Sequence, residues 1–364
     1  MVAINISKNV NNKPKKMPKQ KVEKPREVVA FDIGSSNIKI VEGKYSRNRL
    51  QVYRMMDLPT PEGAIEDGKI INEREIVESI KTVLKRNNVK IKDAVCTTNS
   101  SSIISRDLVI PVVEYDEMET VIRYELEQFL PIRLEDYIIQ YMIIDKIADA
   151  EGPKLKVNVV AYPTLIAKSY FDLLTSLDLN PYVLDVNFNS LGKISSYTQM
   201  IMGGTVAFVD MGATTINVTI FKNGKLDFTR VIKYGGENID YALSTKLDMS
   251  IKSTESEKIE KGCLVRVSEE DIINITIQET MEEILSELER ILQFYNNQSV
   301  GRNIEKIVIY GGTSDLEGLD EFMQRKMNIK TEKVRTLNGV DIMNRRGKEP
   351  LGKYLNAIGS IIRL

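Results

Sequence analysis

Apolar and polar residues alternate with two different periods along this chain, and the periods separate predicted strands from predicted helices. Short apolar runs and alternation of apolar with polar residues, both typical of strands, predict strands over residues 28–33, 37–42, 50–57 and 93–98. A period near that of an α-helix predicts an amphipathic helix over residues 73–86. A strand meander followed by a helix and a further strand indicates an α/β domain with a mixed sheet.

Residues 106–161 break this rhythm. After the sequence RDLVIP, a helix is predicted within EYDEMETVIRYELEQFLP, and two strands follow over residues 137–146 and 156–161, joined by the polar turn ADAEGP. The apolar stripe of the helix consists of Met118, Val121, Ile122, Leu126, Phe129 and Leu130. We expect a small inserted α+β subdomain whose stripe forms its core. Its sheet edge or groove also suits a partner peptide.

The chain then returns to the first domain and begins a second series of elements. A helix is predicted over residues 163–176, a strand over 182–186 and another helix from Asn187. The second half repeats the order of the first, with a strand over 225–233, helices near 250–262 and 269–297, and a buried strand over 307–310. This repetition indicates two related lobes.

The C-terminal residues carry a further apolar stripe at helical spacing. Its members are Leu351, Tyr354, Leu355, Ile358, Ile361 and Ile362. A membrane-binding helix is expected after a flexible linker and with basic residues along its polar face, whereas Lys353 and Arg363 are the only cations here. We therefore expect this helix to pack on the first lobe.

Composition excludes several classes of chemistry. The chain has 364 residues, with 42% hydrophobic and 28% charged side chains, which is ordinary for a globular protein of two or three domains. It contains no histidine, which removes histidine-dependent nucleophilic mechanisms and imidazole zinc sites. Cys96 and Cys263 are far apart in the sequence, so a reducing compartment is expected.

The N-terminal residues differ in composition from the rest. Eight Lys and Arg residues stand against the single Glu23 in residues 1–26, a net charge of +7 in a chain whose total is −1. Prolines and the lack of apolar periodicity predict a disordered basic tail over residues 1–27. We prefer a solvated tail to the alternative, weak attraction to an anionic membrane surface. With no predicted membrane span and no secretory signal, the protein is expected to be soluble and cytoplasmic.

Two similar stretches carry the candidate chemistry. FDIGSSNIKI, residues 31–40, and VDMGATTINVTI, residues 209–220, each predict strand, tight turn and strand. Gly34 and Gly212 let the backbone approach a ligand, and the turn amides and hydroxyls that follow can donate to phosphate oxygens. The two strand-end carboxylates, facing each other across a cleft, would hold a hydrated divalent cation. One such hairpin is weak support for this function, but a duplication is strong.

Three further sites extend this pattern. Asp185 ends a predicted strand, where its carboxylate can align or activate a water; alternatively, Asp185 and Asn187 cap the following helix. Gly235 and Gly236 lead into a helix, whose start supplies free amides near a phosphate. A Gly-Gly-Thr-Ser turn follows the buried strand over 307–310, and its paired glycines let the backbone lie against a flat ring.

The motifs DIGS, DMGATT and GGTS, in this order and spacing, resemble the phosphate 1, phosphate 2 and adenosine motifs of the actin, Hsp70 and sugar-kinase superfamily. Within it, the chain is similar to the PilM family of type IV pilus assembly proteins, whose relative is the cell-division protein FtsA. That closer similarity lies in FDIGSSNIKIVEGK, GAIEDGKIIN, VIRYELEQFLP, LDLNPYVLDVNFNSL and YLNAIGSIIR. It covers nearly everything after residue 27.

The resemblance implies an α/β protein with the actin-like, ribonuclease H-like fold, in which ATP and Mg²⁺ lie between two lobes. The first lobe would comprise residues 28–106 and 162–203, and the inserted α+β subdomain, placed as in FtsA, residues 107–161. Residues 204–364 would form the second lobe, with a helical subdomain over 250–300. The long basic tail departs from the family.

The resemblance also implies roles for individual residues. Asp32 and Asp210 would hold the hydrated Mg²⁺, and Asp185 is the catalytic candidate. The phosphate 1 residues would be Gly34, Ser35, Ser36, Asn37 and Lys39, and the phosphate 2 residues Gly212, Ala213, Thr214 and Thr215. Gly235, Gly236 and Glu237 would lie near the sugar and phosphates, and Gly311, Gly312, Thr313 and Ser314 near the adenosine. Lys39 either reaches phosphate or stays solvated.

The implied function is a cytoplasmic ATP-binding scaffold or switch of the inner-membrane pilus platform, with slow ATP hydrolysis at most. Its implied partners are the cytoplasmic N-terminal segment of PilN and other platform proteins, with no nucleic acid. Association with the membrane would be indirect, through a partner. Formation of a homo-oligomer is left open.

Three alternatives compete with this function. A small-molecule kinase needs an acceptor site, for which no further polar cluster is seen. An Hsp70-type chaperone needs a substrate domain, for which the sequence has no room. An FtsA-like filament protein needs a terminal membrane helix, and the C-terminal stripe does not match one.

Overall fold

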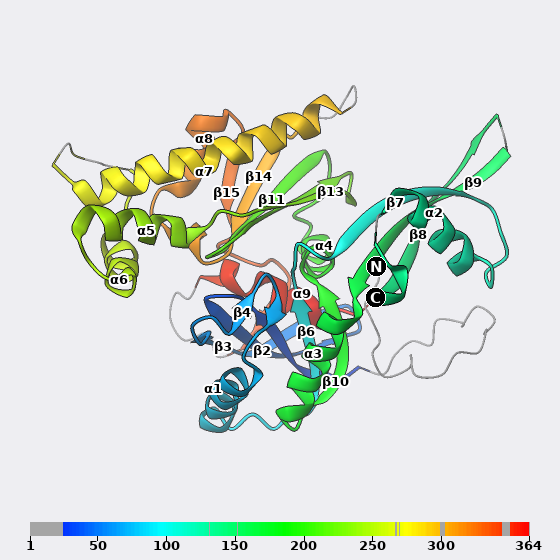
Figure 1. Cartoon of the computed structure of the whole chain (residues 1–364), viewed down its shortest axis with the longest axis horizontal. Coiled ribbons are helices and arrows are strands. Elements are labelled where there is room, and N and C mark those ends of the chain that lie inside the picture. The colour runs from blue at the N-terminus through cyan, green and yellow to red at the C-terminus, as the bar shows by residue number, and fades with distance from the viewer. Residues whose placement is uncertain are drawn as a thin grey trace. The chain divides into compact units, whose positions relative to one another are not determined.

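The computed structural model describes residues 25–130, 132–150, 152–265, 268, 270–298, 303–343 and 350–363. The predicted basic tail lies almost wholly outside these residues. The chain forms two compact units. The first contains the described residues up to Ser190 together with those from Ser360, and the second contains Leu191–Gly359. Figure 1 shows the elements of each unit along the chain.

The first unit is built around a mixed sheet in the order β10-β6-β1-β2-β3. Its strands are β1 (Glu27–Ile33), β2 (Asn37–Ser46), β3 (Arg49–Pro59), β6 (Asp93–Thr98) and β10 (Asn180–Val186). The first three form an antiparallel meander, and β6 lies parallel to both β1 and β10. The short strands β4 (Ile65–Glu66) and β5 (Lys69–Ile70) pair separately. The predicted meander is therefore confirmed.

Helices α1 (Glu73–Arg86) and α3 (Thr164–Ser176) contribute to the core of this unit. Helix α1 buries Ile76, Ile80 and Leu84, which recur every four residues on one face. Its N-cap Asn72 accepts a hydrogen bond from the Glu75 amide, and acidic and basic residues occupy the first and last turns, where they favour the helix dipole. These local signals explain why its predicted bounds match the structure.

Between β6 and α3 the chain forms the inserted subdomain. Its three-stranded sheet has the order β7-β9-β8, from β7 (Ile104–Pro111), β8 (Tyr137–Asp149) and β9 (Gly152–Pro163). Helix α2 (Met118–Phe129) buries Met118, Ile122 and Leu126 in a core separate from that of the main sheet, and a 3-10 turn, η2 (Leu134–Asp136), follows. Strand β7 contains the RDLVIP segment, for which the sequence had predicted no element.

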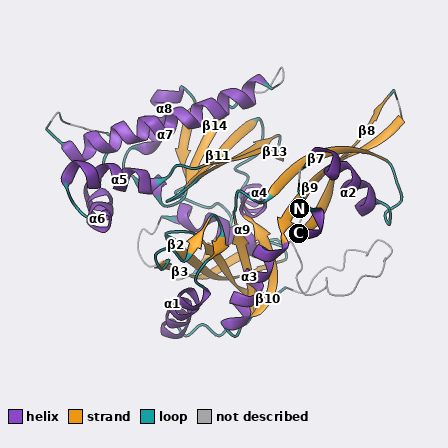
Figure 2. Ribbon diagram, in the orientation of Figure 1, coloured by secondary structure: helices purple, strands orange, loops and turns teal. Residues whose placement is uncertain are grey.

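The second unit repeats the hairpin-plus-strand design. Its sheet has the order β13-β12-β11-β14-β15, with parallel pairing of β11 to β14 and of β14 to β15. Figure 2 draws the strands in orange and labels β11, β13 and β14. The strands are β11 (Thr205–Met211), β12 (Ile216–Lys222), β13 (Lys225–Ile232), β14 (Lys306–Tyr310) and β15 (Lys330–Lys333). Strand β15 was not predicted.

The helices of the second unit complete its core around the sheet. They are α5 (Gly236–Leu247), α6 (Ile251–Lys261), α7 (Ile272–Asn297), α8 (Leu319–Met327) and the 3-10 turns η3 (Thr313–Asp315) and η4 (Leu351–Tyr354). Strand β16 (Val340–Ile342) follows β15 in the chain. Helices α4 (Asn187–Tyr197) and α9 (Leu355–Ile361) each begin in one unit and end in the other.

Candidate functional site

The two predicted phosphate hairpins have the same turn. In the first, β1 and β2 pair through Ile33 and Ile38, and the Gly34 N–H donates to the Asn37 carbonyl over 3.1 Å. In the second, β11 and β12 pair through Met211 and Ile216, and the Gly212 N–H donates to the Thr215 carbonyl over 3.1 Å. Each unit therefore carries one copy of the same four-residue turn.

The carbonyl that closes each turn leaves little space for a Cβ, so the second turn requires glycine and the first favours it. A Cβ on Gly212 would lie 2.6 Å from the Thr215 carbonyl oxygen, and a Cβ on Gly34 would lie 3.0 Å from that of Asn37. Neither glycine is among the residues with positive φ. The close neighbour of each glycine is thus a carbonyl oxygen of its own turn. The sequence analysis had explained the two glycines by the approach of a ligand alone.

Lys39 lies beside the first turn. It pairs with Asp32 across β1 and β2, so both side chains project from the same face of the hairpin. Its ammonium nitrogen would be 3.3 Å from a Cβ placed on Gly34. The first turn therefore has a cation next to it. In the second hairpin Asn217 takes the corresponding position opposite Asp210.

Asp32, Thr97 and Asp185 form one row across three strands. Thr97 on β6 is in register with Asp32 on β1 and with Asp185 on β10. All three strands are parallel, so these residues lie at the carboxyl end of the sheet, where ligands of open α/β sheets bind. The Thr97 hydroxyl donates to Asn187 Oδ1 over 2.9 Å.

The Asp185 carboxylate is only 1% exposed. Its Oδ1 accepts hydrogen bonds from the Val186 amide at 2.9 Å and from Asn189 Nδ2 at 2.6 Å. These bonds fix the strand end to the first turn of α4. These contacts involve the adjacent amide and a side chain of α4, so the capping of that helix by Asp185 and Asn187 and the role of Asp185 toward water both stay predictions.

The second turn is held by the start of α5. The Gly236 amide donates to the Gly212 carbonyl over 3.0 Å, and the Glu237 amide donates to the Ala213 carbonyl over 2.9 Å. A Cβ on Gly235 would approach the Ala213 carbonyl oxygen to 2.2 Å, so this close packing needs glycine. We expected free amides at this helix start. That expectation was wrong for Gly236 and Glu237, because their amides already donate to carbonyls of the second turn.

The Gly-Gly-Thr-Ser turn also contacts the second hairpin. Gly311 has φ +89° and its Cβ position lies 2.4 Å from Asp210 Oδ1. The Thr313 hydroxyl donates to the Gly212 carbonyl over 3.0 Å, and the Ser314 hydroxyl donates to the Gly311 carbonyl over 2.6 Å. A Cβ on Gly312, by contrast, would meet no atom within 4 Å. The structure thus brings together three of the motifs predicted for the second lobe.

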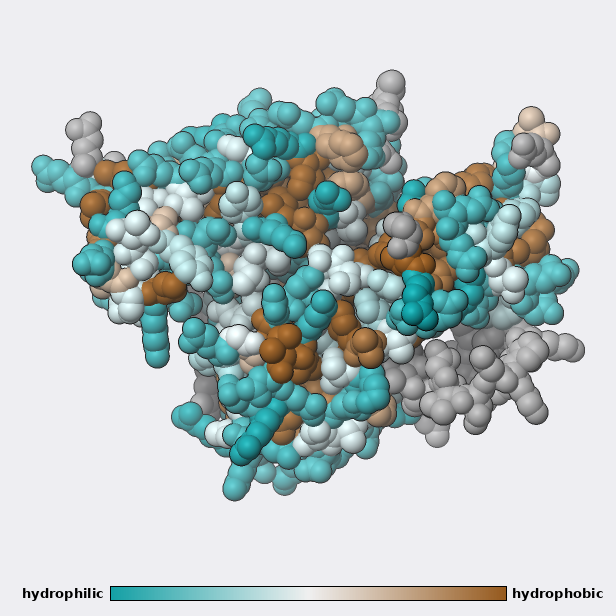
Figure 3. Space-filling view, viewed as in Figure 1, coloured by the Kyte–Doolittle hydropathy of each residue, from teal (hydrophilic) through white to brown (hydrophobic). Residues whose placement is uncertain are grey.

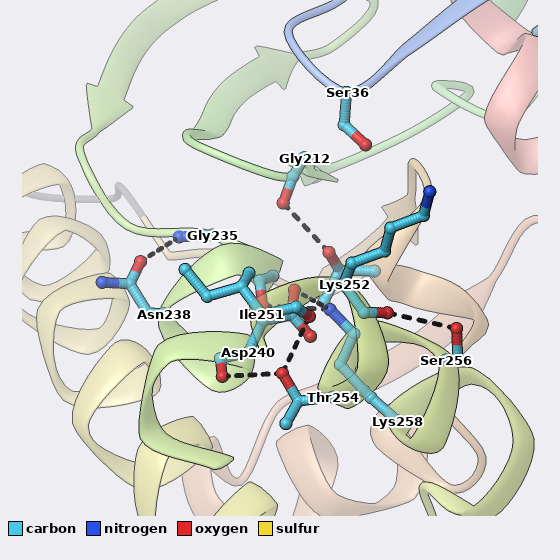
Figure 4. A network of polar contacts seen from close by, with 12 residues as sticks. Ser36, Gly212, Gly235, Asn238, Asp240, Ile251, Lys252, Thr254, Ser256 and Lys258 are labelled. Atoms are coloured by element: carbon cyan, nitrogen blue, oxygen red, sulfur yellow. Dashed lines mark hydrogen bonds and ion pairs between the residues drawn. The ribbon is translucent and has the colours of Figure 1, made fainter. Parts of the chain in front are cut away.

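A polar network supports this cluster from α6 (Figure 4). Lys258 Nζ lies 2.6 Å from Asp240 Oδ2 and 3.0 Å from the Gly236 carbonyl oxygen, and the Thr254 hydroxyl donates to the Asp240 carbonyl over 3.1 Å. Burial raises the pKa of Asp240 above its usual value, more than the attraction of Lys258 lowers it. Burial and the charge of Asp240 also raise the pKa of Glu237.

Several residues of these clusters were missed in the sequence. Thr254 and Lys258, four residues apart on α6, form a polar pair on one helix face, which is a usable signal. Thr60 and Asn356 have no such signal in the sequence. The Thr60 hydroxyl donates to the Gly34 carbonyl over 2.8 Å, and Asn356 Nδ2 donates to Asp210 Oδ2 over 3.1 Å. Both contacts join segments far apart in the chain.

Within the part of the chain that the structure describes, no group of three or more Asp, Glu or Cys side chains is arranged to hold a metal ion. Asp32 and Asp210, the predicted metal ligands, belong to different units. A single carboxylate per unit fits Mg²⁺, which keeps several of its waters and binds through one or two carboxylates and substrate phosphates.

Comparison with known proteins identifies the class and the family. The structure is similar to a chain of a PilM-PilN type IV pilus biogenesis complex, with 21% sequence identity and a TM-score of 0.79. The match covers 93% of this protein and 99% of that chain. This protein covers 95% of MreB5 of Spiroplasma citri bound to ADP with 92% of its length, at 12% identity and a TM-score of 0.50. The predicted actin-like fold is therefore confirmed.

The family follows from the sequence itself. The profile of the family described as type IV pilus assembly protein PilM matches residues 30–363, and the chain belongs to this family. The cell division protein FtsA of Bacillus subtilis is 25% identical over an alignment of 338 residues, and the match covers 81% of this chain and 76% of FtsA. The predicted assignment to type IV pilus assembly is confirmed, and the filament-protein and kinase alternatives are not favoured.

Proposed function

We propose that this chain binds ATP with Mg²⁺ and acts as a nucleotide-dependent scaffold in type IV pilus assembly. The observation that carries the proposal is the identical closure of the two hairpin turns at Gly34 and Gly212. Two copies of one phosphate-binding turn, one in each unit, suit a ligand that has several phosphate groups.

The residues around each turn fit such a ligand. Ser35, Ser36, Thr214 and Thr215 supply hydroxyl and amide donors, and Lys39 supplies a positive charge beside the first turn. Asp32 and Asp210 would hold the hydrated Mg²⁺, which neutralises phosphate charge when bound. Gly312 leaves open space in which the flat face of an adenine can lie against the backbone.

Slow hydrolysis fits the chain better than fast turnover. Asp185 would position the attacking water, but its carboxylate is buried and one of its oxygens already accepts two hydrogen bonds. Cys96 lies on β6, the strand next to that of Asp185. It is no alternative base, because burial and the nearby Asp32 raise the pKa of its thiol well above the usual value. A long-lived nucleotide state suits a switch.

The proposed partner is the cytoplasmic N-terminal segment of a PilN-like membrane protein. A PilM-PilN complex has a similar fold, and the inserted subdomain here exposes apolar side chains. Tyr124 is 64% exposed and Phe129 53% exposed on α2, and Val109 is 50% exposed on β7. Apolar surface on this subdomain alternates with hydrophilic side chains (Figure 3), which suits an extended peptide.

None of the helices in the described residues combines the length and apolar composition needed to cross a bilayer. We propose that the protein works at the cytoplasmic face of the inner membrane and is recruited there by its partner. Other proteins of the pilus platform would join the same assembly.

A pull-down from solubilised membranes, with and without Mg-ATP, tests this proposal. We expect Mg-ATP to change the recovery of a single-span protein with a short cytoplasmic N-terminal segment. A matched sample in which Tyr124 and Phe129 are replaced by Ser should recover less of it while still binding nucleotide in calorimetry. Recovery of division proteins instead, or absence of any nucleotide binding by the parent chain, would contradict the proposal.

A further inference from the structure

Asn356, in the first turn of α9, contacts the predicted metal ligand of the second unit. Its side chain is buried, at 4% exposure, and its Nδ2 donates to Asp210 Oδ2 over 3.1 Å. The two residues are 146 positions apart, and both belong to the second unit. A buried asparagine of this kind must place its amide where both of its polar atoms find partners.

The direction of this hydrogen bond follows from chemistry. An ionised carboxylate only accepts hydrogen bonds, so the amide nitrogen of Asn356 must face Asp210 and its oxygen must point elsewhere. The Tyr310 hydroxyl donates to that oxygen over 3.5 Å. Tyr310 ends β14, directly before the Gly-Gly-Thr-Ser turn. The amide is therefore oriented by a strand end of the same unit.

The other oxygen of Asp210 lies against backbone. Gly311 has a left-handed conformation, and its Cβ position is only 2.4 Å from Asp210 Oδ1. With Gly311 beside Oδ1 and Asn356 on Oδ2, rotation of the carboxylate about its χ2 angle is restricted. A carboxylate with a fixed orientation binds a hydrated cation more tightly than a rotating one, because no conformational entropy of the side chain is lost on binding.

We propose that Asn356 is a positioning residue that orients Asp210 toward the hydrated Mg²⁺ of the bound nucleotide. This inference rests on the proposed nucleotide site. It predicts that replacing Asn356 lowers the part of the ATP affinity that depends on Mg²⁺. The affinity measured in EDTA should change little, because the Asn356 side chain contacts Asp210, the proposed Mg²⁺ ligand.

The test is calorimetric titration of ATP into the full chain, with Mg²⁺ and with EDTA, for the parent and for Asn356→Leu. The hydrogen bond lost is one to a charged group, so the enhancement of affinity by Mg²⁺ should fall by about tenfold or more. Affinity in EDTA should stay at the parent value. Thermal unfolding of each variant checks that the second unit is folded.

Asn274→Leu is the matched control. Asn274 is also a buried asparagine of the second unit, at 6% exposure, and its side chain bonds the Cys263 amide and Asp271 instead of Asp210. It should lower the unfolding temperature but leave the Mg²⁺ enhancement unchanged. A general loss of stability would affect both variants alike, whereas the proposed role affects only one.

Asn356→Ala is the second variant and serves if the leucine variant does not fold. It removes the amide donor without adding a charge or a larger apolar group against Asp210. The Mg²⁺ enhancement should fall here too. A parent-like enhancement in a folded Asn356 variant would overturn this inference alone. A parent chain that binds no nucleotide would overturn the proposed function as well.

Discussion

Gly34 and Gly212 occupy the same place in two copies of one turn: each donates its amide to the carbonyl three residues later, over 3.1 Å in both. The strands that flank the turns also keep the same register, with Asp32 and Asp210 each pairing seven residues onward. Two hairpins in different units therefore share both their register and the hydrogen bond that closes the turn. The two hairpins differ at the position opposite the carboxylate, which is Lys39 in the first and Asn217 in the second. Only the first hairpin therefore has a positive charge at this position.

The first prediction concerns Gly312. Its φ of −63° is accessible to any residue, and a Cβ there meets no protein atom within 4 Å, so the protein's own packing does not require glycine. Gly312→Val should therefore fold like the parent but lower ATP affinity by about tenfold or more, because the added side chain occupies space proposed for adenosine. Calorimetry and thermal unfolding measure the two effects.

Gly311→Ala is the contrasting variant. A Cβ at this left-handed position would clash with Asp210 Oδ1, so the unfolding temperature should fall along with ATP affinity. If Gly312→Val instead binds ATP as tightly as the parent, adenosine does not lie against this turn.

Thr60 is predicted to stabilise the first turn. Its hydroxyl donates to the Gly34 carbonyl and its amide donates to the Ser36 carbonyl. Thr60→Val leaves the Gly34 carbonyl without this donor, and should lower the free energy of unfolding by about 1–3 kcal/mol. Chemical denaturation checks this value.

The control for Thr60 is Thr82→Val on the exposed side of α1. The Thr82 hydroxyl donates to a helix carbonyl that keeps its backbone partner, so the change should stay within about 0.5 kcal/mol. Equal losses in the two variants would show that Thr60 has no special part in the turn.

The two thiols should differ in reactivity. Burial, and then the charge of the nearby Asp32, raise the pKa of the Cys96 thiol well above its usual value, whereas Cys263 is half-buried. A thiol-specific reagent at pH 8 should modify one cysteine in the native chain and both after denaturation, and Cys263→Ser should abolish the native reaction.

The pH dependence has a definite sign. Because the folded pKa of Cys96 lies above its unfolded value, its contribution to stability is complete below the unfolded pKa of the thiol and is lost as the pH rises through the folded pKa. Rapid native modification of Cys96 at pH 8 would contradict the packing of β6 in the core.

Asp185 is predicted to affect hydrolysis more than binding. Asp185→Asn keeps the size of the side chain and removes its charge, so ATP affinity should remain near the parent value while the slow hydrolysis rate falls. A single-turnover assay with radiolabelled ATP measures the rate. Rapid multiple turnover that survives this substitution would rule out both the role of Asp185 and the switch.

Much of the fold was predictable because its signals are local. The bounds of α1 follow from its apolar spacing, the Asn72 cap and the charges of its first and last turns. The two hairpins follow from alternating strands around a Gly turn. Strand β15 was missed, because it has only four residues, KTEK, and owes its place to pairing with β14.

The candidate site was only partly predictable. The Gly, Ser and Thr residues of the turns follow one another in sequence, so their proximity needed no tertiary information. The contacts of Thr60 with Gly34 and of Asn356 with Asp210 depend on how distant segments pack, which no short pattern encodes. The same packing explains why the amides of Gly236 and Glu237 are not free.

The central claim, that this PilM family member couples nucleotide binding to partner binding, is tested most directly by a pair of titrations. A peptide with the N-terminal sequence of the cognate PilN-like protein is titrated into the chain with and without Mg-ATP, and Mg-ATP is titrated with and without the peptide. We predict that each ligand changes the affinity of the other by the same factor, typically about 5-fold to 150-fold. Unchanged affinities in both titrations would contradict the account, because the nucleotide would then be bound without affecting the partner.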